Sequence, residues 1–166
     1  MRRSPAFVYA AVRTPFGRYG GGLSEVRTDD LAPTTLRGLI AKVPHLEPER
    51  INEVILGNAN GAGEDNRNVG RMASLLAGLP VSVPATTVNR LCGSSLDSAM
   101  IGSRMIETGD AEIVLTGRCG VHDTVSLGAA EAQQGLSLSG RDTGLDNAGM
   151  AAGQPGDAEG VDCLPR

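Results

Sequence analysis

The sequence predicts an α/β domain in which helices cover both faces of a parallel β-sheet. Two observations carry this prediction. Short apolar runs alternate with longer stretches of helical periodicity through the first 117 of the 166 residues. Segments rich in glycine and asparagine separate these runs, as loops do. The resulting order is βαβαβαβ, and such alternation is typical of parallel sheets with helical crossovers.

The first half of this pattern supplies two strands and one helix. The apolar run 6–12 predicts a buried strand. Residues 29–43 predict a helix, because apolar residues recur there at helical spacing and Pro33 falls in its first turn. A short helical turn at 48–52 leads into a second strand at 53–59.

The second half supplies two more helices and two more strands. Residues 68–79 predict a helix with one apolar face. The run 84–91 predicts a third strand, and the stretch 92–109 predicts a third helix that ends at Gly109. Small residues surround most of this third helix, so we expect it to be buried on several sides. Residues 112–117 predict the fourth strand.

Residues 118–166 differ in character from the part of the chain before them. They are dense in Gly, Asp, Ala and Gln, and neither a helical nor a strand period persists. We therefore expect one domain at 1–117 and an unrelated, mostly disordered tail at 118–166, with a helical piece at about 127–134. Three chemically reactive side chains are expected to be solvated in this tail, namely Cys119, His122 and Cys163.

The composition argues against several classes of function. The net charge of -4 and the absence of basic runs give no electrostatic basis for binding nucleic acid. No apolar stretch approaches the length of a membrane span. Two N-terminal arginines precede an apolar patch without a cleavage site, so we expect a cytoplasmic protein. The 3 cysteines form no C-x-x-C pair, which argues against a disulfide framework and a zinc site, and we expect no metal.

Cys92 is the candidate catalytic residue. It lies where the third strand is expected to give way to the third helix. The free amides and the dipole at the start of a helix favour the thiolate, which is the nucleophilic form. The dipole contributes only about 0.3–1 kcal/mol, so a catalyst would also need a base. A small buried core side chain is the alternative, and position alone leaves both interpretations open.

The stretch VNRLCGSSLDSA at 88–99 resembles the acyl-enzyme signature of the thiolase family, in which the cysteine of an N-x-x-C-G-S context attacks a 3-oxoacyl thioester. VRTPFGRYGGGLS at 12–24 is similar to the N-terminal loop of these enzymes, and residues 51–80 are similar to their second strand, loop and helix. Residues 6–117 therefore resemble the N-terminal half of a thiolase. GNANGAGEDNRN is most similar to the branch that acts on 3-oxoadipyl-CoA.

Two positions in the signature depart from the family pattern. Ser95 stands where glycine is common, and Ala99 stands where a larger aliphatic residue is common. Neither departure removes the nucleophile.

The resemblance implies an α/β thiolase-like layer that is incomplete, with Cys92 forming the acyl-enzyme. It implies no bound cofactor, CoA and acyl-CoA as substrates, and a homo-oligomer. It also implies a His that activates the nucleophile, a second Cys in a C-x-G-G-G context, and an Asn and a His that form oxyanion holes. These groups belong to the C-terminal half of the family, and no H-P-x-G, N-E-A-F or C-x-G-G-G motif occurs in this sequence.

Three interpretations of function follow from this pattern. The first is an acyl-CoA C-acyltransferase by descent. The second is a catalytically inactive fragment that associates with an intact thiolase chain. The third is a redox or binding module in which Arg90 is the basic neighbour of Cys92.

A change of reading frame at about residues 117–118 would explain why the resemblance and the pattern end together. Codons for residues 118–127, read one nucleotide later, can encode Gly-Val-Glu-Ser-Met, which resembles the family's continuation after the fourth strand. A natural short protein with an unrelated tail is the alternative. The genomic DNA from codon 110 onward distinguishes the two.

Overall fold

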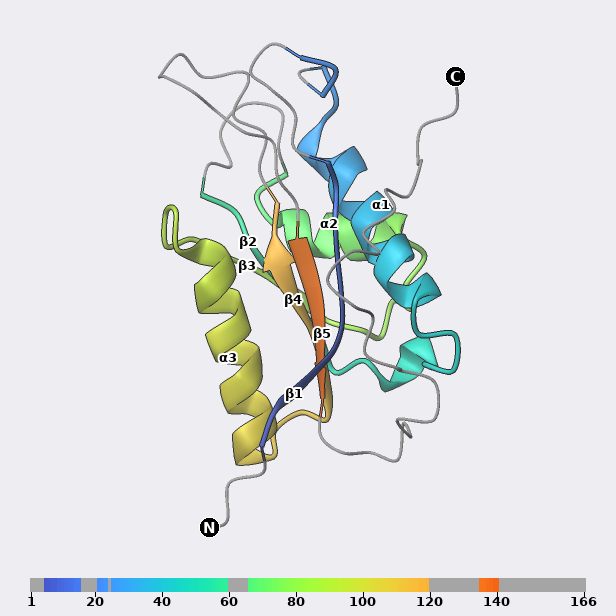
Figure 1. The fold of residues 1–166 in the computed structure, drawn as a ribbon, viewed down its shortest axis with the longest axis vertical. Coiled ribbons are helices and arrows are strands. Elements are labelled where there is room, and N and C mark those ends of the chain that lie inside the picture. The colour runs from blue at the N-terminus through green and yellow to red at the C-terminus, as the bar shows by residue number, and fades with distance from the viewer. Residues whose placement is uncertain (1–4, 16–20, 24, 60–65, 120–134, 141–166) are drawn as a thin grey trace.

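Figure 1 presents a computed structural model of the chain, which describes residues 5–15, 21–23, 25–59, 66–119 and 135–140. Its strands are β1 (Phe7–Arg13), β2 (Glu53–Gly57), β3 (Ala85–Val88), β4 (Ile113–Arg118) and β5 (Gly135–Gly140). Its helices are α1 (Thr28–Ala41), the short 3-10 helix η1 (Pro48–Arg50), α2 (Val69–Leu76) and α3 (Ser94–Thr108). The alternation predicted from the sequence is confirmed.

The centre of the sheet is parallel, as predicted. In the described residues the strand order is β1-β5-β4-β2-β3. Strand β2 pairs in parallel with β3 on one side and with β4 on the other. The carboxyl ends of these three strands therefore lie at the same edge of the sheet.

Strand β5 comes from the segment in which the sequence predicted no strand. It is antiparallel to both β1 and β4 and lies between them, so the sheet as a whole is mixed. Its sequence, GLSLSG, is short, and four of its six residues are glycine or serine, which is why strand propensity does not reveal it. The helix expected at about 127–134 lies outside the described residues, as do His122 and Cys163.

Strand β1 is an edge strand, and the prediction of a buried strand was wrong. Phe7 and Val8 keep 47% and 67% of their surface exposed. The apolar run predicted burial from hydrophobicity alone. Burial of a strand also depends on what lies beside it, and β1 has its described pairing partner, β5, on one side.

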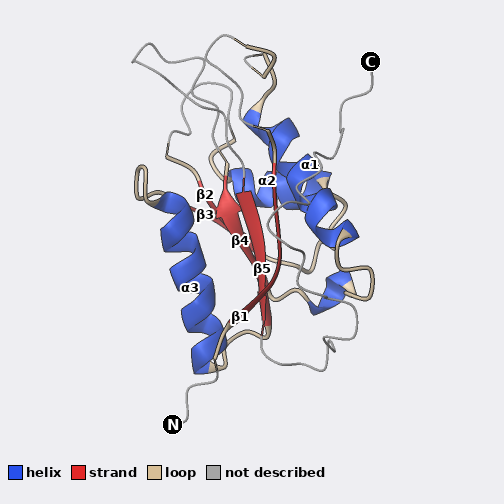
Figure 2. Ribbon diagram, viewed as in Figure 1, coloured by secondary structure: helices blue, strands red, loops and turns tan. Residues whose placement is uncertain are grey.

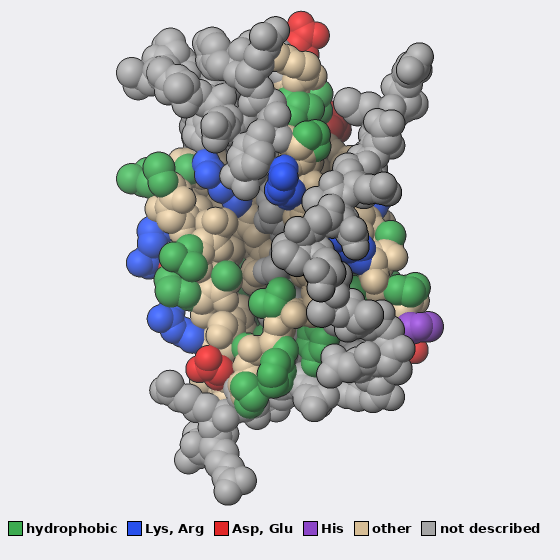
Figure 3. All heavy atoms as spheres, viewed as in Figure 1, with side chains coloured by type: hydrophobic (Ala, Val, Ile, Leu, Met, Phe, Trp, Pro, Cys, Tyr) green, Lys and Arg blue, Asp and Glu red, His purple; other side chains and the backbone are tan. Residues whose placement is uncertain are grey.

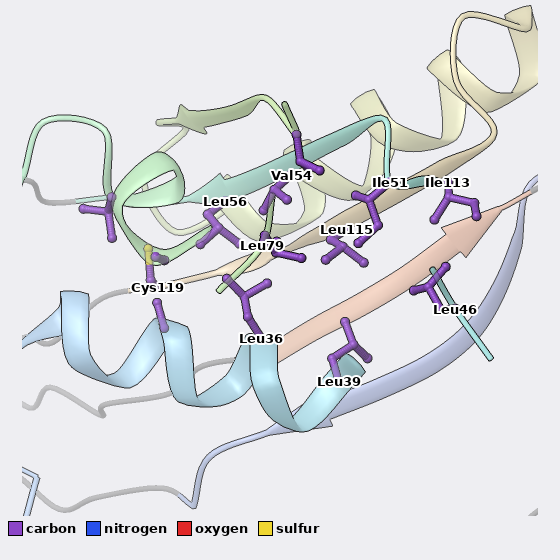
Figure 4. Packing of buried hydrophobic residues seen from close by; sticks show 14 residues of the cluster. Leu36, Leu39, Leu46, Ile51, Val54, Leu56, Leu79, Ile113, Leu115 and Cys119 are labelled. Carbon is purple, nitrogen blue, oxygen red and sulfur yellow. The ribbon is translucent and has the colours of Figure 1, made fainter. Parts of the chain in front are cut away.

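Helices cover both faces of the sheet, with α1 and α2 on one face and α3 on the other (Figures 1 and 2). Strand β2 shows the alternation that this requires. Val54 and Leu56 belong to the larger apolar cluster with Leu36 and Leu39 of α1 (Figure 4). Ile55, between them on the strand, belongs to the smaller cluster under α3. No helix of the described part is long and apolar enough to cross a membrane.

Helix α3 is buried on one face within the described residues, and not on several sides as its composition suggested. Its small residues serve a close approach to the sheet. A Cβ added at Gly102 would lie 2.7 Å from Cγ2 of Thr116, and the hydroxyl of Ser98 donates to the carbonyl of Gly117 at 3.0 Å. Leu96, on another side of the helix, is 65% exposed.

Cys119 is a core residue, and its assignment to a solvated tail was wrong. Its side chain is fully buried in the larger apolar cluster (Figure 4). Its N–H donates to the carbonyl of Gly57 at 2.8 Å, which continues the pairing of β4 with β2 past the last strand residue. The composition change at 118 hid this pairing, because the partner of Cys119 lies far away in the sequence.

Candidate functional site

The candidate site lies at the carboxyl ends of the parallel strands. This edge of an open α/β sheet is where ligands bind, because the loops that leave the strands converge there. Asn58 and Ala59 follow β2, the segment 89–93 follows β3, and Cys119 follows β4. We call the segment 89–93, which connects β3 to α3, the cysteine turn.

Cys92 lies in the cysteine turn with its side chain exposed. The N–H of Gly93 donates to the carbonyl of Arg90 at 3.0 Å, and the N–H of Ser94 donates to the carbonyl of Leu91 at 3.1 Å. These two bonds close a tight turn immediately before the helix. The thiol is therefore accessible to a ligand, which argues against the interpretation of Cys92 as a buried core residue.

Leu91, directly before the cysteine, has a φ of 50°, in the left-handed region. A residue with a branched side chain is rarely found there, and the conformation costs about 1–2 kcal/mol. The side chain of Leu91 is 70% exposed, so burial of this side chain does not offset the cost. Other contacts must hold the turn.

Two side chains hold the backbone of Leu91. The N–H of Leu91 donates to Oδ1 of Asn89 at 2.9 Å. Oγ of Ser94 donates to the carbonyl of Leu91 at 2.6 Å and accepts from the N–H of Arg90 at 2.9 Å. Nδ2 of Asn89 also donates to the carbonyl of Ala59 at 3.1 Å, which ties the cysteine turn to the loop after β2.

Ser94 itself is fixed against the sheet. It is fully buried, and a Cβ added at Gly57 would lie 2.5 Å from its carbonyl carbon and 2.6 Å from its carbonyl oxygen. Glycine at 57 therefore permits the first residue of α3 to lie directly on the end of β2. This contact fixes the height of the cysteine turn above the sheet.

The start of α3 leaves amide groups next to the turn. The N–H of Asp97 donates to the carbonyl of Gly93 at 2.9 Å. Within the described residues, no hydrogen bond uses the N–H groups of Ser95 or Leu96. Unpaired amides at a helix start carry partial positive charge and stabilise anions, including a thiolate or a developing oxyanion.

Arg90 is engaged by a carboxylate. Its Nε lies 3.1 Å from Oδ1 of Asp97, whose side chain is only 11% exposed. The basic neighbour that a redox module would use is thus already paired within the turn and the first turn of α3. Among the described residues, no three His, Cys, Asp or Glu side chains are grouped so that they could hold a metal ion.

A groove of about 410 Å³ lies elsewhere, between α3 and the start of β1. Val8, Met100 and Arg104 are among its lining residues, and none of the cysteine turn is. Figure 3 shows this side of the molecule, where hydrophobic side chains lie among basic ones. The groove is therefore separate from the exposed thiol.

The structure thus brings together more of the site than the sequence predicted. Cys92 lies at the predicted junction, although α3 begins at Ser94 and not at Cys92. Sequence reasoning missed the roles of Asn89, Leu91 and Ser94. An asparagine two residues before the left-handed position is a signal for a side-chain-closed turn and could have indicated Asn89.

The described residues form an α/β layer with an exposed cysteine just before its third α-helix. Sequence comparison identifies this layer: the chain belongs to the thiolase family. The sequence model described as thiolase, N-terminal domain, matches residues 6–134. The chain is 58% identical over 112 residues to the 3-oxoadipyl-CoA/3-oxo-5,6-dehydrosuberyl-CoA thiolase of Escherichia coli K12. It is 56% identical over 112 residues to the β-ketoadipyl-CoA thiolase of Acinetobacter baylyi.

Both alignments cover 68% of this chain and 28% of the relative, so the chain spans a little over a quarter of the length of these proteins. The structure is similar to the crystal structure of the Bacillus anthracis acetyl-CoA acetyltransferase. The TM-score is 0.66 at 33% sequence identity, covering 70% of this chain and 29% of that one. The similarity is therefore to the N-terminal part of complete thiolases.

Proposed function

We propose that this chain is the nucleophile-bearing part of a thiolase, in which Cys92 accepts an acyl group as a thioester. The observation that carries the proposal is the exposed thiol at the start of α3, at the carboxyl ends of the parallel strands, in a chain of this family. The N–H groups of Ser95 and Leu96, which have no hydrogen-bond partner within the described residues, support the proposal, because free amides at a helix start favour nearby negative charge.

The similarity to 3-oxoadipyl-CoA thiolases supports a dicarboxylic 3-oxoacyl-CoA as the substrate. The sulfur of Cys92 attacks the 3-oxo carbon, and the bond between C2 and C3 breaks. A succinyl group then remains on the sulfur, and the departing two-carbon unit takes a proton and leaves as acetyl-CoA. The thiol of free CoA next attacks the succinyl thioester, which releases succinyl-CoA and returns the cysteine. CoA is a substrate here and not a resident cofactor.

The carbon–carbon cleavage needs groups that the family carries in its C-terminal half. A base must take the thiol proton, and an acid must protonate the leaving carbanion. Transfer of an acyl group between two thiols depends less on such a base and acid, because the leaving group is a thiolate and not a carbanion. We therefore expect the isolated chain to undergo thioester exchange with succinyl-CoA and to show no meaningful thiolysis of 3-oxoadipyl-CoA.

Tryptic digestion makes this test specific. Cleavage after Arg90 and Arg104 isolates Cys92 in the peptide 91–104, apart from the other two cysteines. After incubation with succinyl-CoA, mass spectrometry should find the succinyl group on this peptide in the folded protein and not in Cys92→Ala. Equal labelling of the folded and the urea-unfolded chain would mean that folding does not increase the reactivity of Cys92 toward the thioester, and the proposal would then fail.

A second candidate function is a chain without turnover that associates with a complete thiolase chain. The observation that favours it is that β3 is the last strand of the sheet among the described residues, while Leu76 at the end of α2 and Val81 in the segment before β3 are 47% and 77% exposed. A strand edge and exposed apolar side chains can serve for pairing with another chain. Co-purification with a full-length thiolase that carries a different tag tests this second function. A soluble monomer that does not bind the full-length chain would contradict it.

A further inference from the structure

We infer that Asn89 and Ser94 are positioning residues for Cys92, and that they act by fixing both polar backbone groups of Leu91. The inference rests on the proposed function, since it concerns how the nucleophile is presented. It adds two side chains to a site that otherwise consists of one cysteine and the start of a helix.

Leu91 is the residue that needs holding. Its left-handed backbone lies immediately before Cys92 in the turn that leads to α3, and leucine does not adopt this conformation by preference. Its side chain is 70% exposed, so burial of that side chain contributes little to selecting the conformation. The selection must therefore come from hydrogen bonds to its N–H and its carbonyl.

Asn89 holds the N–H side of Leu91. Its Oδ1 accepts that N–H at 2.9 Å, while its Nδ2 donates to the carbonyl of Ala59 at 3.1 Å. The side chain thus connects the cysteine turn to the loop that follows β2. Because the amide side chain uses both ends, its orientation is fixed.

Ser94 holds the carbonyl side of Leu91. Its Oγ donates to that carbonyl at 2.6 Å and accepts the N–H of Arg90 at 2.9 Å. The hydroxyl is a fixed point, because Ser94 is fully buried and its backbone lies against Gly57. The two side chains therefore hold the peptide groups on either side of the strained residue, and the cysteine follows immediately.

Loss of either side chain should let Leu91 relax toward an ordinary φ and move the thiol away from the helix start. The matched control is Ser98, one turn later on α3. Ser98 is also fully buried, and its hydroxyl donates to the carbonyls of Ser95 and Gly117, neither of which belongs to the cysteine turn. Ser98→Ala removes an equivalent hydroxyl from the same helix without releasing Leu91.

The test measures alkylation of Cys92 by iodoacetamide in the full chain, read on the tryptic peptide 91–104. The rate in the folded protein is divided by the rate in the urea-unfolded chain. At pH 7 we expect this ratio to fall roughly two- to fivefold in Asn89→Ala and in Ser94→Ala, the range that a helix start confers on a charge beside it. Asn89→Ser should restore the ratio, because a serine hydroxyl can also accept the N–H two residues on. Ser98→Ala should keep the wild-type value.

The pH profile separates positioning from access to the reagent. If the amides at the start of α3 act on the reacting sulfur, the loss in the variants should be smaller in alkaline than in neutral buffer. A loss of the same size at every pH would indicate restricted access and overturn the inference. So would an unchanged ratio in Asn89→Ala, or an equal loss in Ser98→Ala.

Two further readouts keep the test decisive. Circular dichroism establishes that each variant folds. If Ser94→Ala does not fold, the comparison of Asn89→Ala with Asn89→Ser, at an exposed position, still tests the inference. The succinyl-CoA experiment is independent of alkylation: a wild-type chain that takes no succinyl group while its variants lose alkylation rate contradicts the proposed function and leaves the positioning intact.

Discussion

Replacement of Gly57 by alanine tests the contact that fixes the cysteine turn above the sheet. Gly57 is the last residue of β2, and its backbone φ lies outside the left-handed region, so alanine is not excluded by conformation. Space excludes it. The added Cβ would lie 2.5, 2.6 and 2.7 Å from the carbonyl carbon, the carbonyl oxygen and the Cβ of Ser94.

The magnitude follows from which atoms clash. Extra volume in a well-packed interior costs about 1–3 kcal/mol, and the lower values apply when a flexible side chain can move aside. Two of the three close atoms here belong to the backbone of the first residue of α3, which cannot rotate away. We therefore expect Gly57→Ala to lower the free energy of unfolding by about 3 kcal/mol. With an m-value of about 2 kcal/mol per molar urea, the urea midpoint falls by about 1.5 M.

Gly38→Ala is the matched control for this experiment. Gly38 lies inside α1, and nothing is found within 4 Å of a Cβ placed there. The same substitution should raise the free energy of unfolding by about 0.5–1 kcal/mol, because alanine loses less backbone entropy in a helix than glycine does. If Gly57→Ala unfolds within about 0.5 kcal/mol of the wild type, the close approach of Ser94 to β2 is wrong, and so is the reasoning built on it.

Three further predictions concern the core, a surface ion pair and the second described cysteine. Leu36→Ala should lower the free energy of unfolding by about 2–5 kcal/mol in urea, because the side chain is fully buried between α1 and the sheet, and a loss below 1 kcal/mol would contradict this packing. The Nε of Arg27 lies 2.8 Å from Oδ1 of Asp29, and its hydrogen bond lowers the pKa of that carboxyl. The pair therefore stabilises the fold at pH values above the unfolded pKa of about 3.9. This contribution is lost as the pH falls through the folded pKa. Asp29→Asn should therefore cost about 0.2–1 kcal/mol at pH 7 and nothing in strong acid, and a pH-independent difference between the two proteins would count against the ion pair. Maleimide should label Cys92 in the folded chain and Cys119 only after unfolding, because the first thiol is exposed and the second is buried. Labelling of Cys119 but not of Cys92 in the folded chain would contradict these two placements.

Local patterns predicted those helices, strands and turns whose determining residues all lie within one short stretch of the sequence. The third helix was predicted to end at Gly109, and the structure ends α3 there with a φ of 91° at that glycine. The position of Cys92 between β3 and α3 was also predicted correctly. Both features depend on residues within a few positions of each other, so hydrophobic period and turn chemistry are sufficient to find them.

The errors lie where burial depends on a distant partner. Cys119 was assigned to a solvated tail because its neighbours in sequence are polar, yet it pairs with Gly57 at the end of β2. Helix α3 was expected to be buried on several sides because its residues are small. Small residues are required on the one face that meets β2 and β4, and composition does not say which face that is.

The sequence by itself determined the α/β class, the parallel central strands and the placement of a cysteine before a helix. These depend on periodicity and on a short motif, both of which are local. Only the tertiary structure decided that the side chains of Asn89 and Ser94 fix the backbone of Leu91 beside that cysteine, and that Gly57 allows Ser94 to lie on β2. The physical reason is that a left-handed leucine is stable only if groups on the neighbouring strand and helix hold it, and that arrangement exists only once the chain has folded.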